Sequence, residues 1–178
     1  MRYKDIPSFT EDSGYEVNAP LSLLGSMIDN WISDPYYKLD LLPDFQRGHV
    51  WTKAQQIAFV EYFFRGGQSG RIIYFNKPSW RGQDAIEGYD DFVIVDGLQR
   101  LTALLRFVND DLPIFGRKKS QFEERIRMAS CESNLKFNIN NLKTKQEVLT
   151  WYLEMNTGGT VHTEAEINKV QKMLKDLN

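Results

Sequence analysis

The chain has 178 residues, of which 42% are hydrophobic and 13% aromatic, and its formal net charge at pH 7 is −2. Length and apolar content predict one compact domain with a substantial core, and the small negative charge gives no global electrostatic basis for binding nucleic acid. The single cysteine, Cys131, excludes an internal disulfide and a multi-cysteine metal site. No apolar run resembles a signal peptide or a membrane span, so we expect a cytoplasmic protein with no membrane partner.

Local patterns in the first half of the chain predict two strands and two helices. Asn18 is placed to cap the first helix. Thr52 and Gln55 form a capping box at the start of the second helix, and the Gly66-Gly67 pair ends it. The predicted elements, in chain order, are a strand at 15–17, a helix at about 21–32, a helix from Thr52 to about Phe64 and a strand at 71–75.

The second half begins with a charged, Gly- and Pro-rich loop at 77–90 and continues with further short elements. Capping boxes at Thr144/Glu147 and Thr163/Glu166 open its last two helices. The strands and helices alternate without a regular βαβ rhythm, which favours an α+β fold. The other predicted elements are a strand at 92–95, a turn at 96–97 with a helix through Val108, a short edge strand at 112–115 and a strand at 135–139.

The turn at 96–97 carries the most informative polar residues. Asp96 is placed to cap the helix, and a helix start with an arginine in its first turn, Arg100, suits a bound anion such as a phosphate. The plain alternative is an ordinary capped turn with solvated Gln99 and Arg100. A second Gln-Arg pair, Gln46-Arg47, lies upstream in a segment that reads as extended.

Three segments together resemble a known family: Pro43–Arg47 with Trp51, Val95–Thr102, and Met155–Gly159. In this order and spacing they resemble the ParB/sulfiredoxin-like domain at the N-terminus of GmrSD-type restriction proteins, with its Asp-Gly-Gln-Gln-Arg signature. The resemblance covers about residues 20–170 and implies a small mixed sheet with surrounding helices. It also implies binding, and often hydrolysis, of nucleoside triphosphates in bacterial defence systems that sense modified DNA.

The resemblance assigns residues to a nucleotide pocket. Leu98 departs from the signature by replacing its first glutamine, which puts hydrolysis in doubt more than binding. The catalytic candidates are Asp96, Arg100 and His49. The nucleotide-binding candidates are Gln46, Arg47, Asp96, Gly97, Gln99, Arg100, Thr102, Asn156 and Gly158.

Phosphate chemistry gives these assignments a physical basis. Two arginines from separate elements can clamp a phosphate in a bidentate way, so we expect Arg47 and Arg100 to face one cleft. Mg²⁺ is the expected metal for hydrolysis, with Asp44 and Asp96 as carboxylate candidates; the sequence leaves open whether Asp96 caps the helix or binds a metal. His49 is either a proton-transfer group beside Arg47 or a structural histidine.

Aromatic residues near these segments divide into two groups by position. Phe45 and Trp51 are expected to anchor the core, whereas Trp80 and Tyr89, in the predicted loop, are freer to stack on a base.

Three functions remain open at this point. The first is an NTP-binding domain, with a nucleoside triphosphatase activity, in defence against foreign DNA or in phage counter-defence. The second is a non-catalytic module or decoy that binds a defence-system protein, and the third is a ParB-like DNA nuclease. We expect residues 1–178 to form one domain without the family's helical extension and HNH module.

Overall fold

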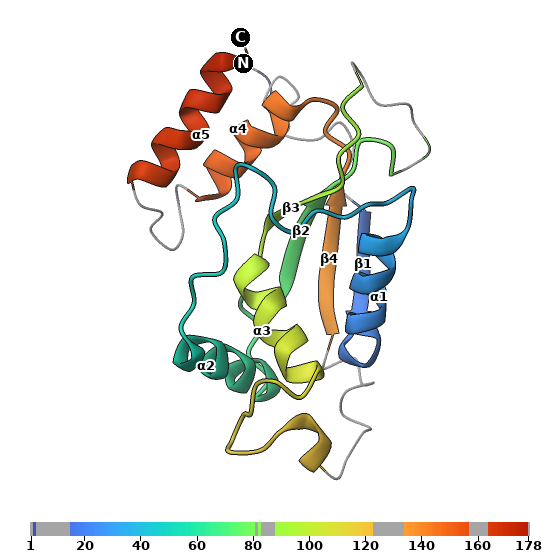
Figure 1. Cartoon of the computed structure of the whole chain (residues 1–178), viewed down its shortest axis with the longest axis vertical. Coiled ribbons are helices and arrows are strands. Elements are labelled where there is room, and N and C mark those ends of the chain that lie inside the picture. The colour runs from blue at the N-terminus through green and yellow to red at the C-terminus, as the bar shows by residue number, and fades with distance from the viewer. Residues whose placement is uncertain are drawn as a thin grey trace.

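The computed structural model describes residues 2, 15–80, 82, 88–122, 134–156 and 164–177. It has the predicted α+β composition, with helices packed around one sheet (Figure 1). The strands are β1 (Tyr15–Pro20), β2 (Ile72–Asn76), β3 (Val93–Asp96) and β4 (Asn134–Asn140). The helices are α1 (Leu21–Ser33), α2 (Lys53–Phe64), α3 (Leu98–Val108), the 3₁₀ turn η2 (Lys119–Gln121), α4 (Lys145–Asn156) and α5 (Glu164–Asp176).

The sheet is mixed, and its strand order is β1-β4-β2-β3. β1 runs antiparallel to β4, β4 runs parallel to β2, and β2 runs antiparallel to β3. The parallel pair requires a long crossover, which includes α3 and carries the chain from the β3 edge back to the middle of the sheet (Figure 1). The turn from β3 into α3 therefore lies at one edge of the sheet, as predicted.

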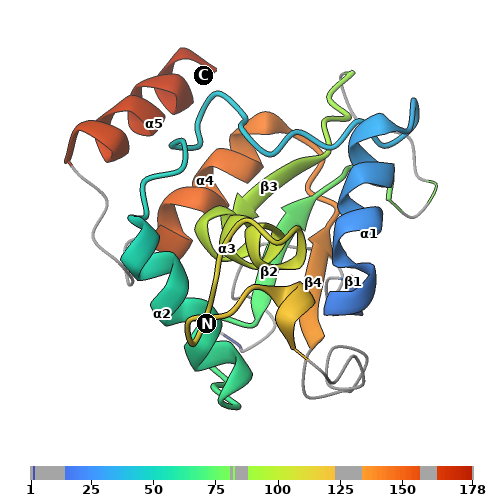
Figure 2. The same cartoon turned by 60° about the horizontal axis from the view of Figure 1, so that its bottom comes forward.

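Two hydrophobic clusters cover opposite faces of the sheet because strand side chains alternate between faces. In β3, Ile94 joins the larger cluster under α1, α2 and α3. Its neighbours Val93 and Val95 join the smaller cluster with α4 and α5. Figures 1 and 2 show the same division, with α1 and α3 over one face, α4 beside β3, and α5 on the outer side of α4. This short strand is thus shared by both cores.

Two of the predicted capping boxes are present. Thr52 Oγ1 accepts a hydrogen bond from the backbone N–H of Gln55, and the Gln55 side chain accepts one from the N–H of Thr52. Thr144 and Glu147 make the corresponding pair at the start of α4. The third box lies outside the described residues.

Two local predictions are wrong. Asn18 does not cap α1, because β1 pairs with β4 as far as Pro20, which is the N-cap residue and makes no side-chain cap. Residues 112–115 form no strand, because a turn brings Ile114 and Arg117 together in a single isolated bridge. Within the described ranges, every helix is too short or too polar to cross a membrane.

Candidate functional site

The start of α3 is built on a glycine that no other residue can replace without strain. Gly97 is the N-cap residue and has a left-handed backbone, with φ at 103°. A Cβ atom added there would lie 2.6 Å from Cδ1 of Ile73, so β2 also packs against this position. These two constraints together explain why the Asp-Gly pair ends β3 and α3 begins at Leu98.

Asp96 does not cap this helix, which corrects the prediction from the sequence. The N-cap residue is Gly97, no side chain caps α3 among the described residues, and the Asp96 carboxylate pairs with Arg100, four residues further on. Arg100 also donates from Nη1 to the carbonyl of Ile72 at 2.9 Å, and its side chain is 18% exposed. The first turn of α3 thus presents backbone N–H groups without a side-chain acceptor, next to an arginine that is fixed in place.

Glutamine side chains join this turn to the segment that carries the upstream Gln-Arg pair. We call that segment, residues 45–52, the 45–52 loop; in Figure 1 it descends past α3 to the start of α2. Gln46 Nε2 donates to the carbonyl of Val95 at 3.3 Å. Gln99 Nε2 donates to the carbonyl of Gly48 at 3.0 Å, and its Oε1 accepts from Val50 at 2.9 Å and Trp51 at 3.1 Å. Two segments about fifty residues apart are therefore bonded to each other in both directions.

His49 lies in the same loop, exposed at the surface. Partial burial and the nearby charge of Arg106 lower its pKa, and a hydrogen bond with the Trp51 backbone only partly opposes them. Arg106 in turn donates to Oε1 of Gln56 at 2.6 Å, and Gln56, which is 2% exposed, donates to the carbonyl of Trp51 at 3.0 Å. The charge that helps to lower the pKa of His49 thus comes from Arg106 of α3, which the sequence had not connected with His49.

The remaining predicted residues lie around this site or outside the described chain. Arg47 is half-buried in the 45–52 loop, and Thr102 is half-buried in α3. Asn156, the last residue of α4, donates to the carbonyl of Tyr152 at 2.6 Å, and the Tyr152 ring packs against Phe45 with centroids 5.2 Å apart. The end of α4 is thus linked to the start of the loop, while Gly158 lies outside the described residues.

Both carboxylates that were considered for a metal are paired with cations. Asp96 pairs with Arg100, and Asp44 pairs with Lys145 at 2.6 Å. In the part of the chain that the structure describes, no three His, Cys, Asp or Glu side chains are grouped so as to hold a metal ion.

The structure shows where the aromatic side chains near these segments pack. Phe45 is 4% exposed and belongs to the smaller core, as expected. Trp80 packs against the larger core, with its ring 5.6 Å from that of Phe92, and Tyr89 packs against the smaller core. Burial and the charges of Asp91 and Asp44 raise the pKa of Tyr89. These contacts leave Trp80 and Tyr89 less free to stack on a base than their place in a loop had indicated.

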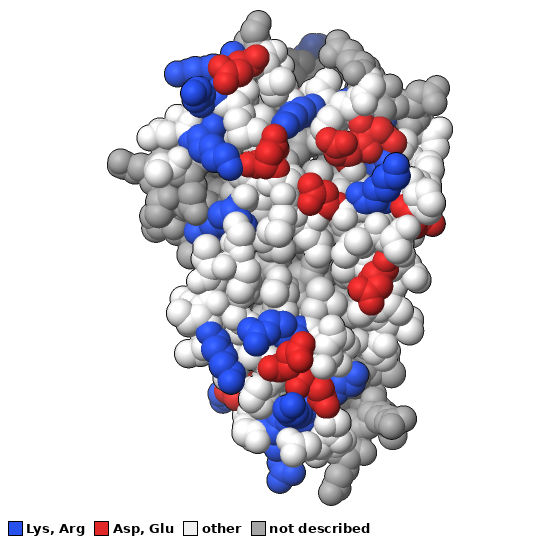
Figure 3. Space-filling model, in the orientation of Figure 1, with Lys and Arg blue, Asp and Glu red and all other residues white. Residues whose placement is uncertain are grey.

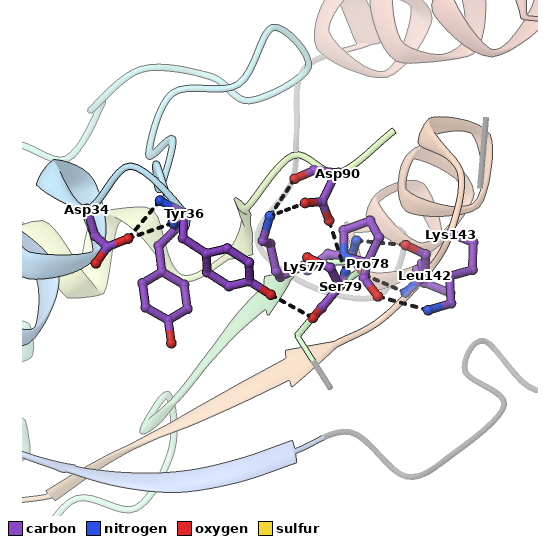
Figure 4. Close-up of polar contacts among 10 residues, drawn as sticks. Asp34, Tyr36, Lys77, Pro78, Ser79, Asp90, Leu142 and Lys143 are labelled. Carbon is purple, nitrogen blue, oxygen red and sulfur yellow. Dashed lines mark hydrogen bonds and ion pairs between the residues drawn. The ribbon is translucent and has the colours of Figure 1, made fainter. Parts of the chain in front are cut away.

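A second polar cluster, absent from the sequence predictions, lies at a hollow of about 470 Å³ beside the 35–40 turn (Figure 4). Lys77 is 2% exposed, and its Nζ contacts the Asp90 carboxylate at 2.6 Å and the Asp90 carbonyl at 2.8 Å. Partial burial raises the pKa of Asp90, but hydrogen bonds from Lys77 and Ser79 and the charge of Lys77 outweigh it and hold the pKa low. The pair ties together the two ends of the loop between β2 and β3, which is a structural role.

One signal in the sequence could have identified Gln56 as a buried, hydrogen-bonded residue of this region. It lies at helical spacing from Val60 and Phe63, which both face the core, so a polar residue there must be hydrogen-bonded. The signal that Lys77 is buried was weaker: it only follows directly after a strand with an apolar, buried pattern.

Surface charge on the face that carries the loop is separated into two groups. Blue and red side chains are interleaved at the upper and lower ends of this face, and a largely uncharged band lies between them (Figure 3). A DNA duplex is bound by neutralising many phosphates in a row, and this face offers no continuous basic surface. The nuclease alternative gains no support here.

Comparison with known proteins identifies the family. The family model described as GmrSD restriction endonuclease, N-terminal domain, matches residues 25–175. The match covers most of the chain, which therefore belongs to this family, and the family associates it with restriction and defence against foreign DNA. No curated protein and no solved structure matches the chain.

Proposed function

We propose that this member of the GmrSD N-terminal domain family binds a nucleoside triphosphate at the start of α3. The observation that carries the proposal is the pair of reciprocal glutamine bonds, from Gln46 to Val95 and from Gln99 to the loop around Gly48. They bring the two Gln-Arg segments into contact, which supports the proposal that Arg47 and Arg100 both take part in binding one ligand. We propose that these arginines approach the phosphates from opposite sides.

The donors at this turn suit a phosphate. An uncapped helix start offers backbone N–H groups and a partial positive charge. An arginine has five N–H donors, so the bonds from Arg100 to Ile72 and Asp96 leave others for an incoming anion. Asp96 competes with the ligand for the same guanidinium, and binding therefore requires this ion pair to loosen.

Hydrolysis is the less supported half of the proposal. Leu98 stands where the signature has its first glutamine, and its side chain is 6% exposed and packed in the larger core. The leucine side chain therefore offers no polar group to a ligand, although its backbone N–H is part of the helix start. A triphosphate would bring Mg²⁺ as its own counterion, and Asp96, which pairs with Arg100, is the carboxylate that could contact this ion. His49, whose pKa is lowered, would be the neutral proton acceptor.

The same observation supports a second candidate function. A signature that keeps its fold-forming residues and replaces a polar one by a buried leucine fits a non-catalytic module that binds a protein of a defence system. Nucleotide binding distinguishes the two functions, because the module alone does not require it.

Isothermal calorimetry with ATP, GTP, CTP and UTP, each with and without magnesium, tests the proposal. We expect Arg100→Ala to weaken binding by about 2–4 kcal/mol, because a charged partner of the phosphate is lost. Arg100→Lys should recover only part of the loss, since it keeps the charge but not the planar donor group.

The matched control is Arg117→Ala, which removes an exposed arginine distant in sequence from both segments. It should leave the binding isotherm unchanged. Identical null traces from the wild type and Arg100→Ala with every nucleotide would defeat the proposal and place the partner-binding module first.

A further inference from the structure

We infer that Gln99 is a positioning residue, whose side chain fixes the 45–52 loop over α3 and thereby sets where Arg47 stands relative to Arg100. This inference rests on the proposed function and adds a role for the signature's second glutamine. The resemblance had placed Gln99 in the nucleotide pocket. In the structure its amide bonds to protein backbone, with three hydrogen bonds of 2.9–3.1 Å to Val50, Gly48 and Trp51.

The loop depends on side chains because it has no strand partner for its backbone. Its residues are neither helix nor strand between Phe45 and Thr52. Trp51 is half-buried, so its backbone N–H needs a hydrogen-bond partner, whereas Gly48 and Val50 are exposed. A glutamine amide carries both a carbonyl oxygen and an N–H₂ group, so Gln99 can serve the loop as a neighbouring strand would, accepting from two N–H groups and donating to one carbonyl.

Other glutamines bond to the two ends of the 45–52 loop, so the bonds of Gln99 can be attributed to the middle of the loop. Gln46 reaches Val95 at one end. At the other end, Gln56 donates to the carbonyl of Trp51, and Gln55 accepts from the N–H of Thr52 at 2.8 Å. Among the described hydrogen bonds, the N–H groups of Val50 and Trp51 have Gln99 as their acceptor.

The coupling to the proposed ligand site is direct. Gln99 and Arg100 are adjacent in the first turn of α3, and Arg100 is fixed by Ile72 and Asp96. Arg47, by contrast, lies in the loop that Gln99 holds, one residue before Gly48. Loss of the Gln99 bonds should therefore displace Arg47 while Arg100 stays in place.

Amide hydrogen exchange measured by NMR on the full chain without ligand tests the holding role. In Gln99→Met, which keeps a similar length and loses both polar groups, the amides of Val50 and Trp51 should exchange about five to ten times faster. Gln99→Glu keeps the acceptor and should preserve most of that protection. Unchanged exchange at both amides in Gln99→Met, with α3 still protected, would overturn the inference.

Gln55→Ala is the matched control, since it removes a glutamine from the same region whose only described loop partner is Thr52. It should accelerate exchange at Thr52 and leave Val50 and Trp51 unchanged. Acceleration of all three amides in this variant would mean that the loop loosens as a whole, and would overturn a specific role for Gln99.

A double-mutant cycle tests whether the role serves the ligand site. With whichever nucleotide the wild type binds, Gln99→Met and Arg47→Ala should each weaken affinity, and the double variant should lose no more than Arg47→Ala alone. Additive losses would overturn positioning through Arg47. If the wild type binds no nucleotide, the proposed function is refuted, and so is a role of Gln99 in positioning Arg47 for a nucleotide. The exchange experiment would still decide whether Gln99 holds the loop.

Discussion

The two Gln-Arg pairs of this chain have the same sequence and opposite structural settings. Gln99-Arg100 lies in the first turn of α3, and Arg100 is fixed by contacts with Ile72 and Asp96, both close to that turn. Gln46-Arg47 lies in a loop without a strand partner, whose position depends on side-chain bonds to the distant turn. Arg100 is held by contacts of the α3 start with β2 and β3, whereas the loop that carries Arg47 is bonded to β3 and α3 through Gln46 and Gln99.

This difference indicates which half of the site should adapt to a ligand. Low-stability segments have few backbone bonds of their own and open more readily than helices packed on a core. We therefore expect the 45–52 loop to shift on ligand binding, with the start of α3 as the fixed reference.

Glycine-to-alanine substitutions should show the largest difference in stability between the start of α3 and the 45–52 loop. Gly97→Ala should lower the free energy of unfolding by about 3 kcal/mol, because it combines a left-handed backbone with a Cβ placed 2.6 Å from Ile73 Cδ1. Gly48→Ala is its counterpart in the loop, where nothing lies within 4 Å of the added Cβ. Its effect should stay within about 0.5 kcal/mol. Urea unfolding of both variants measures the difference, and equal losses would contradict the contrast.

Asp96→Asn should sharpen the role of the fixed arginine. Asp96 is 34% exposed, so loss of its ion pair with Arg100 should cost only about 0.5–1 kcal/mol of stability after allowance for solvent screening. The freed guanidinium should bind triphosphate several times more tightly in calorimetry. If Asp96 instead serves a nucleotide-bound metal, turnover should disappear while metal-free binding persists. Weaker metal-free binding would show that Asp96 supports the site rather than competing with the ligand.

The smallest expected effect is the pH response of the loop. The pKa of His49 is lower in the folded protein than its ordinary value of 6.5, so the unfolded chain takes up a proton first as the pH falls. Stability should therefore be unaffected by His49 above about pH 6.5, decrease as the pH falls below it, and level off below the folded pKa.

Urea midpoints at pH 7.5 and 5.5 for the wild type and His49→Gln measure this response. The drop between the two conditions should be smaller in the variant, because glutamine does not titrate. The other histidine, His162, is present in both proteins and cancels in the comparison. An equal drop in the two proteins would show that the loop does not sense the proton.

The elements predicted correctly from the sequence are those with a local signal. The capping box at Thr52 and Gln55 correctly marked the start of α2, and the apolar run at 92–95 correctly marked β3, because each depends on neighbouring residues. The failures have non-local causes. Asn18 looked like a helix cap, but its backbone is paired in the sheet with Lys136, more than a hundred residues away.

The same reasoning explains what was predictable in the candidate site. Its two polar segments could be identified from the sequence, and the structure places them in contact. The hydrogen-bond partners of their glutamines could not be identified from the sequence. Gln99 bonds to residues that precede it by 48 to 51 positions, and no local pattern indicates such a contact. Asp96 also had two partners within reach, the helix start and Arg100, and only the folded geometry decided between them.

The pairing of β1 with β4 has a consequence for the order in which the protein is made. β1 leaves the ribosome well before β4, which among the described strands is its one neighbour in the sheet, with Tyr15 opposite Ile139. At about 5–20 residues per second, β1 waits on the order of ten seconds for that neighbour. Its sequence suits the delay, since Glu16 and Pro20 both discourage pairing with other chains. Closure of the sheet is therefore a late event, reached only after both Gln-Arg segments have been synthesised.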